Sequence, residues 1–189
     1  MKSICVYCGS SKGFSSDYSD AATELGKTLA DKKIQLVYGA GNVGLMGVIA
    51  DAVLKEGGHV LGVIPRFLKE WEVCHDGLTE LIVTETMHER KSIMEKRSDG
   101  IIMMPGGFGT LDEFFEILTW KQLKLHNMPI GVLNVNGYYD SIMEHVRKMS
   151  KEGFLKESNL DLFCISSTVE GLLQKMAASG SVGGGKWVE

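Results

Sequence analysis

The amino-acid sequence predicts a single-domain α/β fold, built on a doubly wound, mostly parallel sheet of about seven strands with helices on both faces. Two observations support this prediction. Short apolar runs rich in valine and isoleucine alternate with longer stretches of helical periodicity, which is typical of β-α-β units around a parallel sheet. In addition, 189 residues with 44% hydrophobic content supply enough apolar side chains for one sizeable core.

Seven apolar runs have the length and composition of strands, at residues 3–7, 35–38, 60–64, 80–84, 100–104, 130–134 and 162–165. Between the first two runs, apolar side chains recur at helical spacing from Tyr18 to Leu29, and Ser15, Ser16 or Asp17 is available as the helix cap. The same spacing predicts helices at 45–56, 87–97, 110–125, 139–152 and 169–178. We expect one domain over residues 1–178 and a flexible tail over 179–189, where glycine and serine follow no period.

Charge and composition argue against several classes of partner. Lysine and arginine total 20 against 24 acidic residues, so the net charge of −4 offers no basic surface for nucleic acid. No apolar run approaches the roughly 20 residues that cross a bilayer, and the N-terminus has no signal-peptide pattern, so we expect a cytoplasmic protein without a membrane partner. The four cysteines are expected to be free thiols. Cys5 and Cys8 form a CxxC inside a predicted strand, which favours buried thiols over a redox or zinc site.

A first glycine-rich loop, Gly39-Ala40-Gly41-Asn42-Val43-Gly44, matches GxGxxG between the strand at 35–38 and the helix at 45–56. Glycines let the backbone approach a phosphate closely, and the unpaired N–H groups of a helix start attract it. The next strand leads into Arg66 and lacks the acidic residue that holds the ribose of NAD. Three interpretations stay open: a nucleotide phosphate site that includes Gly41, an NADP site that uses Arg66, or a tight turn that binds nothing.

A second glycine-rich loop is more specific. The strand at 100–104 runs into Pro105-Gly106-Gly107-Phe108-Gly109-Thr110-Leu111-Asp112-Glu113, where a long helix begins. Three glycines expose main-chain N–H groups and Thr110 adds a hydroxyl, which predicts an anion-binding cradle. Glu113 would repel a phosphate, and two roles fit its spacing equally well. It acts on another part of the ligand, or it forms a capping box by bonding back to the N–H of Thr110.

A third cluster, Met87-His88-Glu89-Arg90-Lys91, opens the helix at 87–97. Two cations near a helix N-terminus oppose the helix dipole, and an anionic ligand would resolve that conflict, whereas a solvated surface is the alternative. This cluster, both loops, and Gly9 and Ser10 all follow predicted strands. Because the carboxyl ends of parallel strands share one edge of the sheet, we expect one ligand site at that edge.

Together, three motifs resemble the LOG (Lonely Guy) family of cytokinin riboside 5′-monophosphate phosphoribohydrolases: Pro105-Gly106-Gly107-x-Gly109-Thr110-x-x-Glu113, Met87-His88-x-Arg90-Lys91 and Gly44-Leu45-Met46-Gly47. The resemblance extends from Cys8 to about Ser166, and the first motif is highly specific. It implies a Rossmann-like fold, usually a homodimer, that hydrolyses the N-glycosidic bond of AMP, N6-modified or plain, to the free base and ribose 5-phosphate. It implies no organic cofactor and no metal.

The resemblance also assigns site residues by motif position. Arg90 and Glu113 would form the catalytic pair. The substrate-binding positions would be Gly9, Ser10, Gly41, Glu72, Met87, Lys91, Pro105, Gly106, Gly107, Gly109 and Thr110. One departure is Ala40, where many relatives have glycine, and we expect the alanine to lose access to positive φ. Two other functions stay open: a nucleotide or phosphorylated-cofactor carrier without turnover, and an NADP-dependent oxidoreductase.

Overall fold

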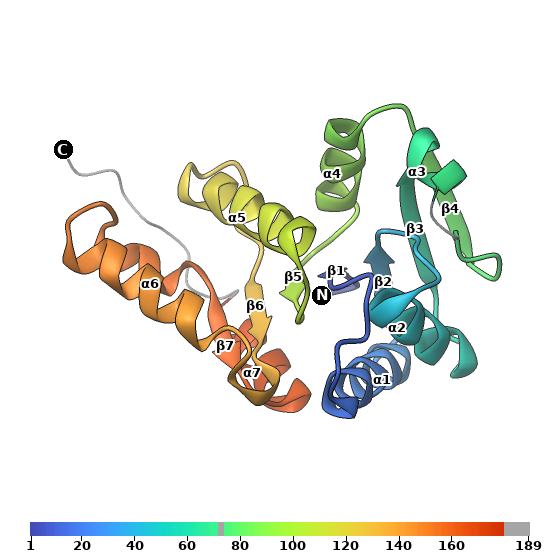
Figure 1. Ribbon diagram of the computed structural model, residues 1–189, viewed down its shortest axis with the longest axis horizontal. Coiled ribbons are helices and arrows are strands. Elements are labelled where there is room, and N and C mark those ends of the chain that lie inside the picture. Colours follow the sequence, from blue (N-terminus) through green and yellow to red (C-terminus); the bar gives the residue numbers. More distant parts are fainter. Residues whose placement is uncertain (72–73, 180–189) are drawn as a thin grey trace.

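The computed structural model describes residues 1–71 and 74–179, and these residues build one sheet of seven parallel strands (Figure 1). The strands are β1 (Ser3–Tyr7), β2 (Gln35–Tyr38), β3 (Val60–Pro65), β4 (Glu80–Thr84), β5 (Ile101–Met103), β6 (Ile130–Leu133) and β7 (Cys164–Ser166). They lie in the order β4-β3-β2-β1-β5-β6-β7, and each neighbouring pair is parallel. The predicted Rossmann-like α/β class is therefore confirmed.

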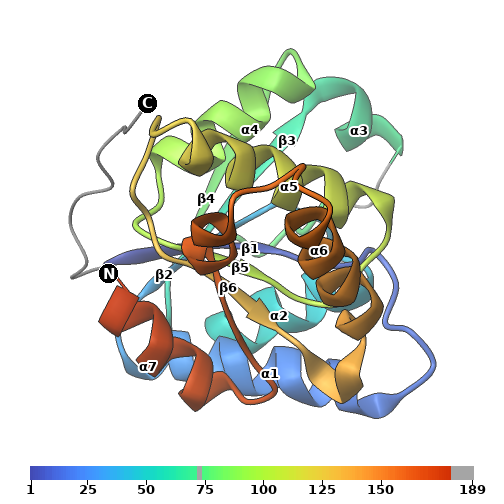
Figure 2. The same cartoon turned by 90° about the vertical axis from the view of Figure 1, so that its left-hand side faces the viewer.

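The described residues also form seven α-helices and two short 3-10 helices. They are α1 (Ser16–Asp31), α2 (Gly44–Lys55), α3 (Arg66–Trp71), α4 (Met87–Lys96), α5 (Phe108–Gln122), α6 (Asp140–Lys151), α7 (Val169–Ser179), η1 (Val135–Gly137) and η2 (Glu157–Leu162). The apolar side chains of α1, α2 and α7 pack on one face of the sheet, and those of α4, α5 and α6 pack on the other (Figure 2). Both faces of the sheet are thus covered, as a parallel sheet requires.

Side chains of β1 alternate between the two cores. Ile4 and Val6 belong to the core under α1 and α2, whereas Cys5 and Tyr7 belong to the core under α4 and α5. Cys8 lies in the first core, so the two cysteines of the CxxC face opposite sides of the sheet. Burial raises the pKa of both thiols far above the ordinary value, and the thiols are free. The expectation that they are buried small side chains is confirmed.

The strand order places a topological switch point at the centre of the sheet. β1 pairs with β2 on one side and with β5 on the other. The chain leaves β1 through α1 on one face and leaves β5 through α5 on the opposite face. The two loops therefore diverge, and the crevice between them at the carboxyl ends of β1 and β5 is where such folds bind ligands.

Three sequence predictions differ from the structure. The last strand was expected at 162–165, but η2 extends through Leu162, and β7 begins at Cys164. α3 was not predicted, because six residues are too short to show a helical period. Ser179, expected at the start of the tail, ends α7, while the rest of the expected tail, 180–189, lies outside the described residues.

Of the three residues available to cap α1, Ser15 is the N-cap, and its hydroxyl accepts the N–H of Asp17.

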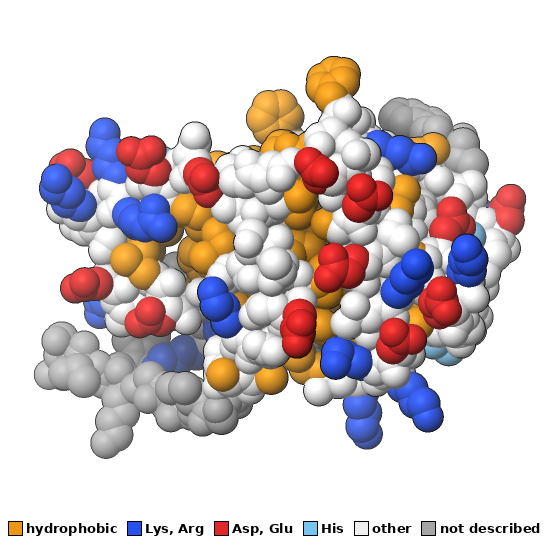
Figure 3. Space-filling model, turned by 90° about the horizontal axis from the view of Figure 1, so that it is seen from below, with side chains coloured by type: hydrophobic (Ala, Val, Ile, Leu, Met, Phe, Trp, Pro, Cys, Tyr) orange, Lys and Arg blue, Asp and Glu red, His pale blue; other side chains and the backbone are white. Residues whose placement is uncertain are grey.

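The surface seen from below mixes both signs of charge. Lysine, arginine, aspartate and glutamate side chains alternate there with hydrophobic ones, and no continuous basic area is visible on this face (Figure 3). Among the described helices, none combines the length and the apolar character needed to cross a bilayer.

Candidate active site

The second glycine-rich loop lies at the switch point, between the end of β5 and the start of α5. Gly107 is the N-cap of α5, so the helix begins at Phe108. Within the described residues, no acceptor is bonded to the main-chain N–H groups of residues 107–110. A methyl group placed on Gly107 or Gly109 would meet no atom within 4 Å. The space over these N–H groups is open, as anion binding at a helix start requires.

Hydrogen bonds from neighbouring loops hold this loop in place. The N–H of Gly9 donates to the carbonyl oxygen of Pro105 at 3.0 Å. Tyr138 and Tyr139, which follow β6, donate their hydroxyls to the carbonyl oxygens of Gly106 and Met104, each at 2.8 Å. These bonds use only carbonyl groups of the loop, so its N–H groups remain available to a ligand.

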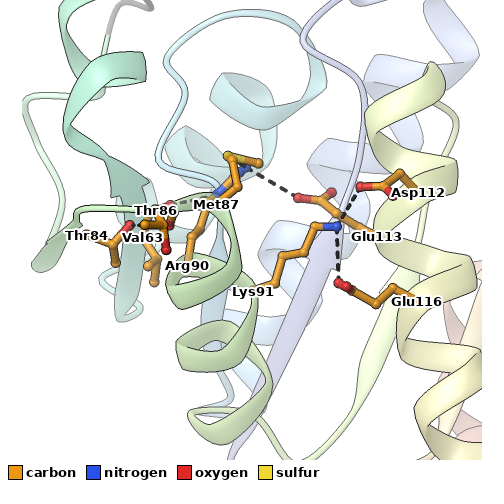
Figure 4. Close-up of polar contacts among 9 residues, drawn as sticks. All are labelled: Val63, Thr84, Thr86, Met87, Arg90, Lys91, Asp112, Glu113 and Glu116. Atoms are coloured by element: carbon orange, nitrogen blue, oxygen red, sulfur yellow. Dashed lines mark hydrogen bonds and ion pairs between the residues drawn. The ribbon is translucent and has the colours of Figure 1, made fainter.

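The capping-box interpretation of Glu113 is wrong. Because α5 begins at Phe108, Thr110 is the third residue of the helix rather than its cap, and it is only 4% exposed. No hydrogen bond from the described residues reaches the Glu113 carboxylate, which points across to α4 (Figure 4). The Glu113 carboxylate therefore takes no part in capping α5.

Arg90 is held in the first turn of α4. Thr86 caps this helix, and its hydroxyl accepts the N–H of Glu89 at 3.1 Å. The Nε of Arg90 donates to the carbonyl oxygen of Val63 in β3 at 3.1 Å. A methyl group on Gly39 would overlap Nη2 of Arg90, so the glycine that opens the GxGxxG motif makes room for the guanidinium.

Arg90 of α4 and Glu113 of α5 face each other (Figure 4). Nη1 of Arg90 lies 3.5 Å from Oε1 of Glu113, and the two side chains are 10% and 11% exposed. Burial raises the pKa of the Glu113 carboxyl, although Arg90 and then Lys91 act to lower it. A buried carboxylate with a raised pKa, beside a guanidinium and without hydrogen bonds, is an arrangement that catalytic sites use.

Lys91 also bridges α4 and α5. Its Nζ lies 2.6 Å from Oδ2 of Asp112 and 3.1 Å from Oε2 of Glu116, and its side chain is 13% exposed. Burial lowers the pKa of Lys91, but hydrogen bonds to the two carboxylates outweigh that effect, and the pKa is raised. The lysine charge is therefore directed at α5.

The first glycine-rich loop is closed by its neighbours. The N–H groups of Leu45 and Met46, at the start of α2, both donate to the carbonyl oxygen of Gly9, at 3.0 and 3.4 Å. Gly41 is buried and forms an isolated bridge with Cys74. The helix start that the pyrophosphate of a dinucleotide would need is thus occupied by the loop after β1.

The expectation for Ala40 is wrong, because this alanine has φ +63°. Its Cβ faces Gly62 in β3, where a methyl group would lie 2.7 Å from it, so the neighbouring glycine gives the strained alanine its space. Arg66, the residue on which an NADP site would depend, forms an ion pair with Glu85 at 2.9 Å. Neither Ala40 nor Arg66 therefore favours a dinucleotide.

Comparison with known proteins identifies the family. A family model described as possible lysine decarboxylase matches residues 46–176. Cytokinin riboside 5′-monophosphate phosphoribohydrolase LOG5 of Arabidopsis thaliana is 44% identical over 94% of this chain and 78% of its own length. The probable enzyme of the same name, LOGL9 of Oryza sativa subsp. japonica, is 46% identical over 93% of this chain and 78% of its own length. The chain belongs to the LOG family.

Solved structures share the LOG-like fold at lower identity. The molybdenum cofactor carrier protein from Chlamydomonas reinhardtii has a TM-score of 0.69 and 20% identity, over 94% of this chain and 96% of that one. The molybdenum cofactor binding protein from Rippkaea orientalis has a TM-score of 0.68 and 24% identity, over 94% and 97% of the two chains. At these identities the likeness establishes the fold alone.

Most LOG motif residues gather at one edge of the sheet. Those around the Arg90–Glu113 pair and the glycine-rich loop before α5 are Gly9, Met87, Arg90, Lys91, Pro105, Gly106, Gly107, Gly109, Thr110 and Glu113. Ser10 is exposed next to Gly9. Gly41 lies under Met46 in the closed first loop, and Glu72 lies outside the described residues. Sequence reasoning missed Tyr138 and Tyr139, although their place after a predicted strand is a signal that points to the same edge.

A surface hollow of about 560 Å³ lies away from the LOG motif residues. It is lined by residues of the β6 and β7 ends and of two helices, among them Asn134, Asp140, Arg147, Ser166 and Lys175. Its lining includes neither Arg90 nor Glu113. Among the described residues, no three histidine, cysteine, aspartate or glutamate side chains are arranged to hold a metal ion.

Proposed function

We propose that this protein hydrolyses the N-glycosidic bond of adenosine 5′-monophosphate, N6-modified or plain, and releases the free base and ribose 5-phosphate. Its relatives at 44% and 46% identity are named for this activity on cytokinin riboside 5′-monophosphates. The observation that best supports the proposal is the buried carboxylate of Glu113, 3.5 Å from Arg90 and one helical turn from the open start of α5.

The start of α5 is the proposed phosphate site. The free N–H groups of residues 107–110 and the positive end of the helix dipole favour an anion there. Glu113 follows Thr110 by three residues, about 4.5 Å along the helix axis. A ribose that extends from a phosphate at the helix start therefore brings C1′ near the Glu113 carboxylate.

Glu113 and Arg90 then act on the anomeric carbon. Breaking the bond from C1′ to the purine nitrogen leaves positive charge on the ribose ring, which the Glu113 carboxylate stabilises. Water adds to C1′ and gives one proton to Glu113, while the bonding electrons leave with the base. The base takes a proton from solvent, and Glu113 returns its proton to solvent. Arg90 favours the ionised state of Glu113 and offers its remaining N–H groups to ligand oxygens.

The phosphate supplies binding energy far from the bond that breaks. Because that energy positions C1′ at Glu113, nucleosides without a phosphate are expected to be poor substrates. Equal kcat/KM for adenosine and AMP would contradict this part of the proposal.

The protein is proposed to work as a homodimer in the cytoplasm. Four large apolar side chains on or just after α5 are exposed, Phe108, Phe115, Leu123 and Leu125, and self-association would cover them. The free cysteines suit a reducing compartment. Light scattering after size-exclusion chromatography tests the assembly, and a monomer at micromolar concentration would contradict it.

A substrate panel tests the reaction. Purified protein is incubated with AMP, its N6-isopentenyl derivative, CMP, GMP and adenosine, and free base is measured by chromatography. We expect base release from one or both adenine nucleotides and none with Glu113→Gln. Tight binding of AMP by the wild-type protein without release of adenine would instead indicate a carrier.

A further inference from the structure

The Arg90–Glu113 pair depends on the spacing of two helices. Arg90 belongs to α4 and is anchored to β3 through the Val63 carbonyl, whereas Glu113 belongs to α5, which follows β5. β3 and β5 are separated in the sheet by β2 and β1. At 3.5 Å and without a hydrogen bond, the pair does not fix this spacing by itself.

Lys91 provides the short contacts between the same helices. Its ammonium lies between Asp112 and Glu116 of α5, at 2.6 and 3.1 Å (Figure 4). Lys91 directly follows Arg90 in the sequence. Asp112 in turn directly precedes Glu113. The contact between Lys91 and Asp112 therefore joins the sequence neighbours of Arg90 and Glu113. A shift of this contact would move both Arg90 and Glu113.

We propose that Asp112 and Glu116 are positioning residues, which hold Lys91 as a strut between α4 and α5 and so keep the Arg90 guanidinium at the Glu113 carboxylate. This inference rests on the proposed function, because it assigns the two acids a task in that reaction. Neither acid touches the substrate. Both act through Lys91.

The charges around Glu113 make the proposal testable. From α4 it is faced by Arg90 and Lys91, and from α5 by Asp112 and Glu116. The buried Cys5, Tyr7 and Cys8, from β1 and its end, also interact with its charge. Both cations lower the pKa of Glu113, and both neighbouring acids raise it.

The double variant Asp112→Ala/Glu116→Ala separates the two possible roles of the acids. If the acids only add charge, their removal lowers the pKa of Glu113, and the acid limb of kcat against pH moves to lower pH. If they hold the strut, Lys91 is released, Arg90 and Glu113 separate, and the limb moves to higher pH. We expect the second result, with kcat for AMP reduced about tenfold to a hundredfold. KM should change by less than about threefold, because the phosphate donors are untouched.

Glu80→Gln is the matched control. It removes the carboxylate that pairs with Arg97, where Nη2 of Arg97 lies 2.8 Å from Oε2 of Glu80. Arg97 is at the C-terminal end of α4, away from the Arg90–Glu113 pair. We expect this variant to keep wild-type kcat and the wild-type acid limb. An unchanged kcat in the double variant, a limb at lower pH, or an equal loss in Glu80→Gln would overturn the proposal.

A second readout separates this inference from the proposed function. The Glu113 carboxyl is titrated by carbon-13 NMR in wild-type protein and in the double variant, and its signal is assigned by its loss in Glu113→Gln. A higher pKa in the double variant supports the strut and a lower one overturns it, whether or not the wild-type protein releases base. Absence of base release from every nucleotide would refute the proposed function alone.

Discussion

Gly39→Ala adds one methyl group beneath the proposed catalytic arginine. The new Cβ would overlap Nη2 of Arg90 and lie 3.4 Å from Cζ and 3.3 Å from Sδ of Met46. The guanidinium must therefore move, which breaks its hydrogen bond to Val63 and its approach to Glu113. Overpacking of this kind costs about 1–3 kcal/mol. Each kcal/mol lowers Tm by about 2–4 °C in a chain of this size.

The activity should fall further than the stability. Loss of one group that stabilises the transition state typically reduces kcat by about a hundredfold to a thousandfold, and we expect a similar loss for Gly39→Ala on AMP. The matched control is Gly57→Ala, where φ is +71° and a methyl group would meet no atom within 4 Å. That strain costs about 1–2 kcal/mol but lies away from the site, so its kcat should stay near wild type. Wild-type kcat and Tm in Gly39→Ala would refute the reasoning.

Five further predictions concern the same site. Arg90→Lys should lose most turnover in the base-release assay, because an ammonium cannot reproduce the guanidinium fork, and retained activity would contradict that role. Since burial raises the pKa of Glu113, turnover should fall as the pH drops through that raised value, with an acid limb above the usual range of a glutamate, as a pH profile of kcat would measure. The same shift makes Glu113 reduce folding stability as the pH rises through that window, because the unfolded chain releases the proton first. Gly109→Ala should raise KM for AMP about tenfold while Tm holds, because its methyl group meets no protein atom within 4 Å but would crowd a phosphate bound at the start of α5. Tyr138→Phe should weaken binding of AMP about threefold to tenfold by calorimetry, since Gly106 loses its hydroxyl donor; unchanged affinity would remove Tyr138 from the site.

Strands and long helices could be predicted because their signals are local. Six of the seven expected strands begin within one residue of their observed starts, since short valine- and isoleucine-rich runs between turns carry the pattern themselves. The seventh was misplaced because Leu162 is apolar but belongs to η2. A 3-10 turn has no period long enough to separate it from the start of an edge strand.

The candidate site was predictable in its parts and not in its contacts. The motif around Gly107 and the cations after Thr86 each have a local signal. The sequence could not tell that Arg90 bonds to Val63 or that Gly39 lies under its guanidinium, because those contacts join separate strands and helices. Spacing favoured a capping box at Thr110 as much as catalysis, and the earlier start of α5 excludes the capping box.

The carbonyl oxygen of Gly9 has a consequence for ligand choice. It accepts the N–H groups of Leu45 and Met46 in the first turn of α2, whereas the N–H groups of residues 107–110 at the start of α5 have no acceptor among the described residues. A molecule with one terminal phosphate matches this arrangement, whereas the additional phosphates of ADP or ATP would need a second set of N–H donors. We therefore expect this protein to favour nucleoside monophosphates over di- and triphosphates.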